Sequence, residues 1–364
     1  MTLQCGIVGL PNVGKSTLFN ALTQTAAAQA ANYPFCTIEP NVGRVNVPDE
    51  RLEKLTKIAG SATIIPTQIE FVDIAGLVKG ASKGEGLGNQ FLSHIREVDA
   101  IINVVRCFED ENITHVEGNV DPLRDIELIQ LELIIADMES LEKRIPNLEK
   151  KAKTDKEIAE QIVVAKKILE VLKAGKAART ADLSGEEQKV MQQLQLITSK
   201  PQLFVCNLKE HEVAGNKYSQ MVSDFCAKNN FMSLNICAQI EAEVASLATD
   251  EEKLEFLQSV GLKETGLTQI IRSSFKLLEL ITFFTVGPKE CHAWTLKKNL
   301  SAPKAAGVIH TDFEKGFIRA ETISYQNYIE FNGEEGCKTS GKLRLEGKDY
   351  IVQDGDVFHF RFNV

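Results

Sequence analysis

A glycine-rich stretch near the amino terminus has the residue types and spacing of a phosphate-binding loop. Residues 9–17 read GLPNVGKST, which fits the pattern G-x-x-x-x-G-K-S. Glycines let backbone N–H groups converge on phosphate oxygens, and a helix N-terminus adds partial positive charge. We expect Lys15 to bridge the β- and γ-phosphates and to be catalytic, and the Ser16 hydroxyl to bind Mg²⁺. The residues expected to bind the nucleotide here are Asn12, Val13, Gly14, Lys15, Ser16 and Thr17.

Two further segments supply candidate groups for the metal ion and the γ-phosphate. Residues 69–74, IEFVDI, read as a buried strand that ends at Asp73, with glycine three residues on. We expect Asp73 to hold a Mg²⁺-bound water and the Gly76 N–H to reach the γ-phosphate, which makes Gly76 a candidate catalytic group. Thr37, in the loop NYPFCT, is the candidate that completes the magnesium shell when a triphosphate is bound.

These groups require elements that hold them in place. Residues 3–8 form a short apolar run before the loop, and apolar residues recur at helical spacing from Leu18 to Leu22 after it. The order strand, glycine loop, helix is therefore predicted. Further buried strands are expected at residues 100–106 and 202–206, so the pattern is that of an α/β domain.

Composition places the chain among ordinary globular proteins. Its 364 residues are 43% hydrophobic and 25% charged, which predicts two or three domains and excludes a disordered or fibrous chain. No apolar window reaches membrane-spanning length and no basic leader precedes the first strand, so we expect a cytoplasmic protein without a membrane partner. The eight cysteines lack C-x-x-C spacing and are expected to be reduced. A net charge of −9 argues against a chain that coats nucleic acid with its whole surface.

The chain resembles one family over essentially its whole length. The segments GLPNVGKST, NYPFCT and DIAGLVKGASKGEGLGN carry this resemblance. They are similar to those of the YchF-type branch of the Obg-related P-loop NTPases, also called Obg-like ATPases. Residues 80–89 then fit a mobile second switch, because their glycines let the backbone reorganise when a γ-phosphate arrives or leaves.

The group that orients the attacking water is not the usual one. Many related switch proteins have glutamine after D-x-x-G, but this chain has Leu77, whose aliphatic side chain cannot hold a water. The family it resembles likewise has a hydrophobic residue there. Another side chain, a monovalent cation or a partner must therefore act, and slow intrinsic turnover is expected. By family analogy Asn12 is a ligand for a cation such as K⁺. His115 is the first candidate for a catalytic side chain, because it is expected at a strand edge or in a loop after the strand at 100–106, with a structural role as its alternative.

Base recognition is expected after the strand at 202–206. Asn207-Leu208-Lys209-Glu210 stands where guanine-reading relatives have N-K-x-D, whose Asp accepts hydrogen bonds from guanine N1–H and the exocyclic amine. Glu210 reaches further than Asp, and Leu208 offers an apolar surface in place of the lysine. The resemblance associates N-x-x-E with ATP, so we expect Asn207, Leu208 and Glu210 to bind its base. GTP remains the alternative, as does a nucleotide sensor with negligible turnover.

Four ranges describe the expected domains. Residues 1–125 and 200–280 are predicted to form the two parts of a P-loop NTPase domain with a mostly parallel sheet. Residues 126–199 are predicted to insert a helical hairpin, or coiled coil, because apolar residues alternate spacings of three and four in two stripes, from Leu131 to Leu148 and from Ile158 to Leu172. Residues 281–364 change to short strands and resemble a TGS domain, a β-grasp module of translation-associated proteins.

The predicted hairpin has an unusual charge. From Lys143 to Arg179 there are eleven basic and five acidic residues, whereas residues 281–364 contain eleven of each. Because phosphate attraction acts locally in salt, a basic arm of this kind favours contact with a ribosome or RNA, to which the TGS domain would contribute. A solvated coiled-coil face is the alternative.

Overall fold

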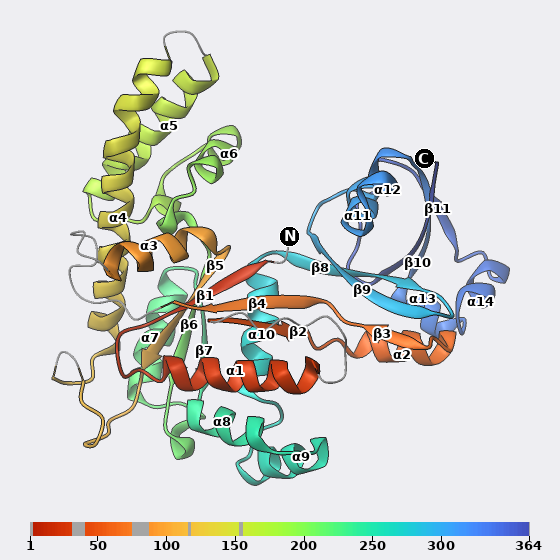
Figure 1. The fold of residues 1–364 in the computed structure, drawn as a ribbon, viewed down its shortest axis with the longest axis horizontal. Coiled ribbons are helices and arrows are strands. Elements are labelled where there is room, and N and C mark those ends of the chain that lie inside the picture. The colour runs from red at the N-terminus through yellow and green to blue at the C-terminus, as the bar shows by residue number, and fades with distance from the viewer. Residues whose placement is uncertain (1–2, 31–40, 75–86, 116–117, 153–155, 364) are drawn as a thin grey trace. The chain divides into compact units, whose positions relative to one another are not determined.

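The computed structural model describes residues 3–30, 41–74, 87–115, 118–152 and 156–363 (Figure 1). The chain divides into two units, one made of Met1–Arg44 and Glu70–Gln269, the other of Val45–Ile69 and Ile270–Val364. We call these the first and the second unit. None of the helices in the described ranges combines the length and the apolar character needed to cross a bilayer. The seven cysteines in these ranges are all buried.

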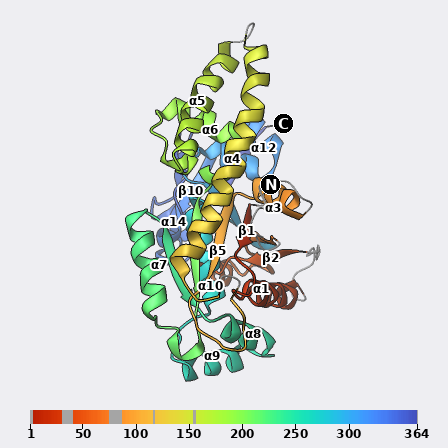
Figure 2. The same cartoon turned by 90° about the vertical axis from the view of Figure 1, so that its left-hand side faces the viewer.

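The first unit is built on a six-stranded sheet with helices on both faces (Figures 1 and 2). β1 lies between β4 and β5 and is parallel to both, and β6 is parallel to β5 and β7. At the β2 edge, Asp73 N–H donates to Asn41 O and Val47 N–H to Thr67 O, which is an antiparallel pattern. The predicted mostly parallel sheet is therefore confirmed. Its strands, in the order in which they pair, are β2 (Val42–Asn46), β4 (Gln68–Asp73), β1 (Gln4–Val8), β5 (Ala100–Arg106), β6 (Gln202–Asn207) and β7 (Met232–Ile236).

The helices of this unit lie between its strands and after the last of them along the chain. They are α1 (Lys15–Ala30), α3 (Leu87–Glu97), α4 (Pro122–Lys151), α5 (Lys156–Lys173), α6 (Gly185–Leu194), α7 (Lys217–Lys228), α8 (Ala238–Ser246), α9 (Asp250–Ser259) and α10 (Gly266–Leu277), which leads into the second unit. The described part of the unit also contains the short 3₁₀ turns η2 (Ala178–Thr180), η3 (Ile197–Ser199) and η4 (Glu210–Glu212).

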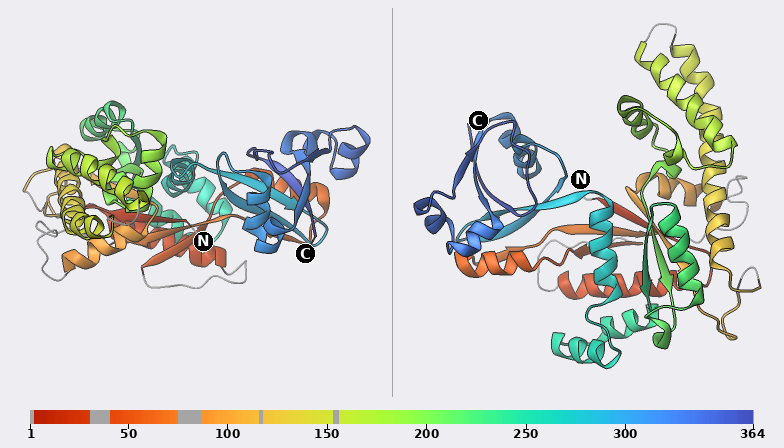
Figure 3. Two further views of the ribbon diagram at one scale, coloured as in Figure 1. Left: turned by 90° about the horizontal axis from the view of Figure 1, so that it is seen from above. Right: turned by 180° about the vertical axis from the view of Figure 1, so that it is seen from behind.

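The predicted helical hairpin is present as α4 and α5, which stand together beyond the sheet (Figures 2 and 3). α4 begins where the Asp121 side chain accepts a hydrogen bond from Arg124 N–H, with Pro122 at its first position. Leu131, which fits the predicted apolar stripe, is 51% exposed, so the stripe is wrong at that position. The buried apolar residues that α4 and α5 share with α6 and its flanks are Ile134, Leu141, Ile145, Val164, Ala165, Ile168, Leu169, Leu172, Ala178, Leu183, Leu194 and Leu196.

The second unit is a mixed six-stranded sheet whose β-grasp architecture agrees with the prediction (Figures 1 and 3). β8 pairs antiparallel with β9 and parallel with β12, and α11 and α12 pack against the sheet through a core that contains Phe283, Phe317 and Phe360. Its strands, in pairing order, are β11 (Arg344–Glu346), β10 (Phe317–Ser324), β12 (Asp356–Phe362), β8 (Leu280–Val286), β9 (Glu290–Lys297) and β3 (Thr63–Ile65). Its helices are α2 (Glu50–Ala59), α11 (Ala302–Ile309), α12 (Thr311–Lys315), α13 (Tyr325–Glu330) and α14 (Glu334–Thr339).

The two units differ from the predicted ranges at residues 45–69. These residues were expected inside the nucleotide domain, but β3 pairs in parallel with β9, and Leu52 and Leu55 of α2 pack in one cluster with Phe284. The amphipathic pattern of α2 shows that one face is buried, but not which distant strands cover it. The C-terminal segment of the second unit also begins at Ile270 rather than at residue 281.

Candidate nucleotide-binding site

The phosphate-binding loop connects β1 to α1 as predicted. Gly14 has φ +92°, and a Cβ there would lie 2.2 Å from Asn207 Nδ2. A Cβ on Gly9 would lie 2.8 Å from Val104 O. Both glycines are therefore required, one by backbone conformation and both by close approach. Leu18 N–H donates to Gly14 O at 3.0 Å, which closes the first turn of α1 directly behind the loop.

Lys15 and Asp73 meet at the adjacent ends of β1 and β4. Lys15 is 9% exposed, and its Nζ donates to Asp73 Oδ1 in an ion pair. Ser16 and Thr17 are exposed in the first turn of α1, where helix N–H groups are unpaired. A hydroxyl and a carboxylate are the oxygen ligands that Mg²⁺ prefers, so Ser16 and Asp73 fit the expected ion. The predicted residues Thr37 and Gly76 lie outside the described residues.

Asn207 connects the phosphate loop to the segment after β7. Its Nδ2 donates to Val13 O at 2.9 Å, and its Oδ1 accepts from Ala238 N–H at 2.9 Å. The side chain is 5% exposed, and both of its polar ends are used within the protein. The structure thus brings Asn207 to the site, as a brace between two backbone segments.

A pocket of about 880 Å³ opens beside this brace. Glu210 is exposed at its rim, at the start of η4, whereas Leu208 is 2% exposed and also packs in the apolar cluster around Phe204. Leu208 nevertheless lines the pocket, so its contact with a base stays a prediction. The lining residues are Asn12, Gly14, Thr17, Phe108, Asp110, Ile113, Asn207, Leu208, Lys209, Glu210, His211, Cys237, Ala238, Gln239, Ala242, Glu243 and Ser246.

The segment after β5 forms one wall of the pocket, which was not predicted from the sequence. The buried Arg106 guanidinium donates to Phe108 O at 3.1 Å and to Ile113 O at 3.0 Å, and burial lowers its pKa. Asn216 Nδ2 donates to Cys107 O at 2.7 Å from the start of α7. Because β5 and β6 are parallel neighbours, the residues that follow them lie at the same edge of the sheet. The order of these two strands could therefore have indicated this wall of the pocket.

His115 lies close to the phosphate loop but has a partner of its own. It is 8% exposed, and its Nε2 lies 2.9 Å from Asp125 Oδ2, while Arg124 approaches the other oxygen of Asp125 at 3.0 Å. The preceding residue, Thr114, accepts a hydrogen bond from Asn12 Nδ2 at 3.2 Å. His115 thus joins the loop to the first turn of α4, and its catalytic role stays a prediction.

Curated relatives share the whole length of the chain. It is 56% identical over 368 residues to a protein of Bacillus subtilis (strain 168) named "Ribosome-binding ATPase YchF", with all of both chains covered. The chain belongs to the YchF family. A YchF protein of Haemophilus influenzae with the same name is 56% identical over 365 residues, again with full coverage. Among solved structures, that titled "Structure of the Schizosaccharomyces pombe YchF GTPase" matches with a TM-score of 0.89 and 38% identity, and it covers 99% of this chain and 98% of the other.

Two family models divide this YchF-family chain in sequence. The model described as "50S ribosome-binding GTPase" matches residues 4–135, which include the phosphate loop, Asp73 and His115. The YchF C-terminal model, described as "Protein of unknown function (DUF933)", matches residues 280–363 in the second unit. The family inferred from three short sequence segments is therefore confirmed.

Proposed function

We propose that this YchF-family chain is a Mg²⁺-dependent molecular switch that hydrolyses ATP to ADP and phosphate and that binds the ribosome. One observation carries the proposal. The phosphate loop, which is held by Asn207 and in which Lys15 pairs with Asp73, lies beside the pocket of about 880 Å³. The 56% identical relatives named ribosome-binding ATPases support the same activity and partner.

The chain's own groups would act mainly by positioning the phosphates and stabilising their charge. Lys15 would turn from Asp73 to the β- and γ-phosphates, and the backbone amides of residues 12–17 would hold the phosphate oxygens. Ser16 and Thr37 would hold Mg²⁺, with Asp73 bound to it through a water. The ion would neutralise charge on the phosphate oxygens when bound. Gly76 N–H is proposed as the contact to the γ-phosphate.

The water-positioning group is proposed to be either His115 or a K⁺ ion held at Asn12. Asn12 supports this because it has φ +63° in the loop and its side chain lies within hydrogen-bond distance of residue 114. His115 would have to move away from Asp125 to reach a water, which fits slow turnover in the absence of a partner. A K⁺ titration of phosphate release distinguishes the two possibilities, because phosphate release depends on the cation only when K⁺ at Asn12 positions the water.

ATP is proposed as the nucleotide in preference to GTP. Glu210 stands at the pocket rim where a guanine-reading protein has Asp, and the longer side chain places its carboxylate one methylene further out. The Schizosaccharomyces pombe relative is titled a GTPase and the bacterial relatives are named ATPases, so GTP is the competing candidate. Competition of ATP and GTP for a fluorescent nucleotide on the purified chain decides between them, and tighter GTP binding would refute the assignment.

The partner is proposed to contact the helical arm of α4 and α5 together with the second unit. Lysine side chains are exposed on the arm, although some of them form ion pairs with glutamates. Lys166 Nζ lies 2.6 Å from Glu149 Oε1, and Lys167 Nζ lies 2.9 Å from Glu187 Oε1. A ribosomal partner would place the protein in the cytoplasm. Phosphate release measured with and without ribosomes tests the partnership, and a nucleotide sensor without turnover would remain at background in both.

A further inference from the structure

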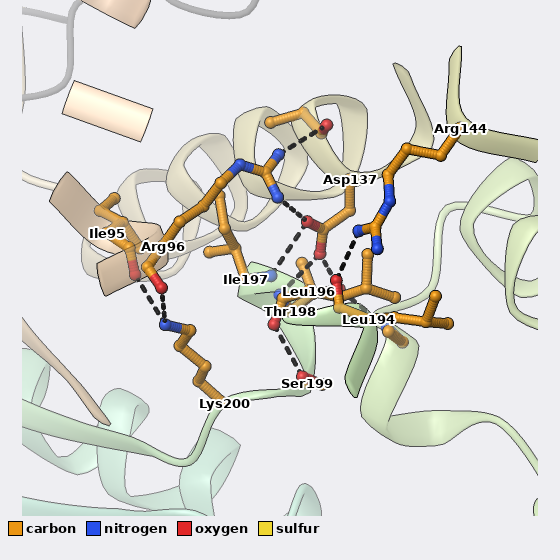
Figure 4. A network of polar contacts seen from close by, with 12 residues as sticks. Ile95, Arg96, Asp137, Arg144, Leu194, Leu196, Ile197, Thr198, Ser199 and Lys200 are labelled. Carbon is orange, nitrogen blue, oxygen red and sulfur yellow. Dashed lines mark hydrogen bonds and ion pairs between the residues drawn. The ribbon is translucent and has the colours of Figure 1, made fainter. Parts of the chain in front are cut away.

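A polar cluster joins α3 to the base of the helical arm (Figure 4). From α3, Arg96 extends its guanidinium across to α4, where Nη2 donates to Ala136 O at 3.2 Å and Nη1 lies 3.5 Å from Asp137 Oδ1. The Arg96 side chain is 30% exposed and that of Asp137 is fully buried. One side chain of α3 thus holds both the backbone and a buried carboxylate of α4.

Asp137 in turn holds the segment that leads into β6. Its carboxylate accepts Ile197 N–H at 2.9 Å, Thr198 N–H at 2.7 Å and the Thr198 hydroxyl at 2.8 Å. These residues belong to η3, shortly before β6, the strand that ends at Asn207. A buried carboxylate that accepts this many hydrogen bonds holds α4 and η3 together, because loss of any of these bonds would leave a charge or an N–H unpaired.

Lys200 holds the other end of the same cluster. Its Nζ donates to Ile95 O at 3.0 Å, to Arg96 O at 2.6 Å and to Val98 O. A cation among the last carbonyls of a helix satisfies groups that have no partner within the helix. The C-terminal end of α3 is therefore tied to the residue that follows η3.

The two helices leave open space between them beside this contact. A groove of about 270 Å³ is lined by Leu92, Ser93 and Arg96 of α3 and by Ala136, Glu139, Ser140 and Lys143 of α4. Since polar and small side chains line most of this groove, α3 can shift along α4 here without opening an apolar core. The Arg96 contact, in contrast, transmits a shift directly.

We propose that the Arg96 contact with Asp137 couples movement of α3 to the helical arm, so that the nucleotide state changes the arm's position. This rests on the proposed function, because α3 begins at Leu87, within the segment 80–89 predicted to respond to the γ-phosphate. A displaced α3 must either break the contact or tilt α4. Lys151 lies about 21 Å along the helix from Asp137, so a tilt of about 10° moves it by about 4 Å.

Hydrogen–deuterium exchange of the full chain, with and without a non-hydrolysable ATP analogue, tests this coupling. In the wild type we expect the amides of α4 and α5 to change their exchange rate by about 5-fold when the analogue binds, as for a typical coupling between sites. Arg96→Gln should abolish this difference and lower the melting temperature, because the buried Asp137 loses its cationic partner, while its analogue affinity stays near that of the wild type. The matched control is Arg144→Gln, because Arg144 also joins α4 to a backbone carbonyl, Leu194 O at 2.7 Å, without touching α3.

A second variant keeps the test valid should Arg96→Gln fold poorly. The planar guanidinium of Arg96 contacts Ala136 O through Nη2 and Asp137 through Nη1, a fork that lysine does not reproduce, so Arg96→Lys should reduce the exchange difference. An undiminished difference in both Arg96 variants, or an equal loss in Arg144→Gln, would overturn the coupling. Analogue affinity of the wild type, measured on the same samples, reports separately on the proposed function: without binding the function fails too, whereas normal binding with unaltered arm exchange defeats only the coupling.

Discussion

Replacing Asn207 by alanine tests whether its side chain binds the base of the nucleotide or holds the phosphate loop in place. The side chain makes two buried hydrogen bonds of 2.9 Å, to Val13 O and from Ala238 N–H, and alanine would leave both backbone groups without this partner. Each buried group left unpaired costs about 1–3 kcal/mol, so Asn207→Ala should lower the free energy of unfolding of the first unit by about 2–6 kcal/mol. A typical domain has about 5–15 kcal/mol in total, so a loss of about 2–4 kcal/mol leaves the variant folded at 25 °C.

The nucleotide affinities then distinguish the two roles of Asn207. A brace shapes the phosphate loop, which ATP and GTP use alike, so both dissociation constants should rise by the same factor, about tenfold for each 1.4 kcal/mol lost. Titration of a fluorescent ATP and a fluorescent GTP, with a thermal melt of each sample, measures both effects. Asn235→Ala is the matched control, because Asn235 lies beside Cys206 on the next strand, β7, and is only half-buried. A changed ATP to GTP ratio with an unchanged melt would refute the bracing role.

Three further perturbations have defined outcomes. Gly14→Ala should abolish nucleotide binding detectable by calorimetry, because the new Cβ would lie 2.2 Å from Asn207 Nδ2 at a φ of +92°. Lys15→Ala should weaken ATP binding by about 10- to 150-fold, since a hydrogen bond to a charged group contributes about 1.5–3 kcal/mol, and a fluorescent-ATP titration would contradict this with unaltered affinity. Burial lowers the pKa of His292 to about 4, so its neutral form stabilises the second unit above the unfolded pKa of 6.5, and this stability is lost as the pH falls from 6.5 through 4. Trp294, the single tryptophan, stacks on the His292 ring with 3.6 Å between the ring centroids, so its fluorescence emission should change with a midpoint near pH 4. A midpoint near pH 6.5 would contradict the burial argument.

Local sequence patterns predicted the elements well where chemistry constrains neighbouring residues. The phosphate loop needs glycine, lysine and a hydroxyl at fixed spacing between a strand and a helix, so its position and its neighbours β1 and α1 could be read directly. The hairpin of α4 and α5 was visible as two apolar stripes, although Leu131 fits the spacing and is exposed. Spacing alone does not tell which side of a helix meets its partner when apolar residues occupy more than one stripe.

Long-range contacts decide the features that the sequence did not reveal. Asn207 is predicted to bind the base, and the sequence did not reveal that its side-chain amide also forms hydrogen bonds with Val13 O and Ala238 N–H, which β6 approaches only in the folded sheet. His115 was chosen by its place after a strand, whereas its pairing with Asp125 depends on how α4 begins. The same holds for Arg96 and Asp137, two ordinary charged residues in sequence that become a buried contact between helices.

The parallel pairing of β3 with β9 has a consequence for how the protein is synthesised. Thr63 pairs with Glu290, so β3 leaves the translating ribosome roughly 230 residues before its partner. At about 5–20 residues per second this delay is on the order of 10–50 s. During that interval the apolar face of α2, with Leu52 and Leu55, lacks the strands that bury it. A fragment that starts at residue 280 would likewise lack its edge strand and this helix, so expression of the second unit alone requires residues 45–69 to be joined to it.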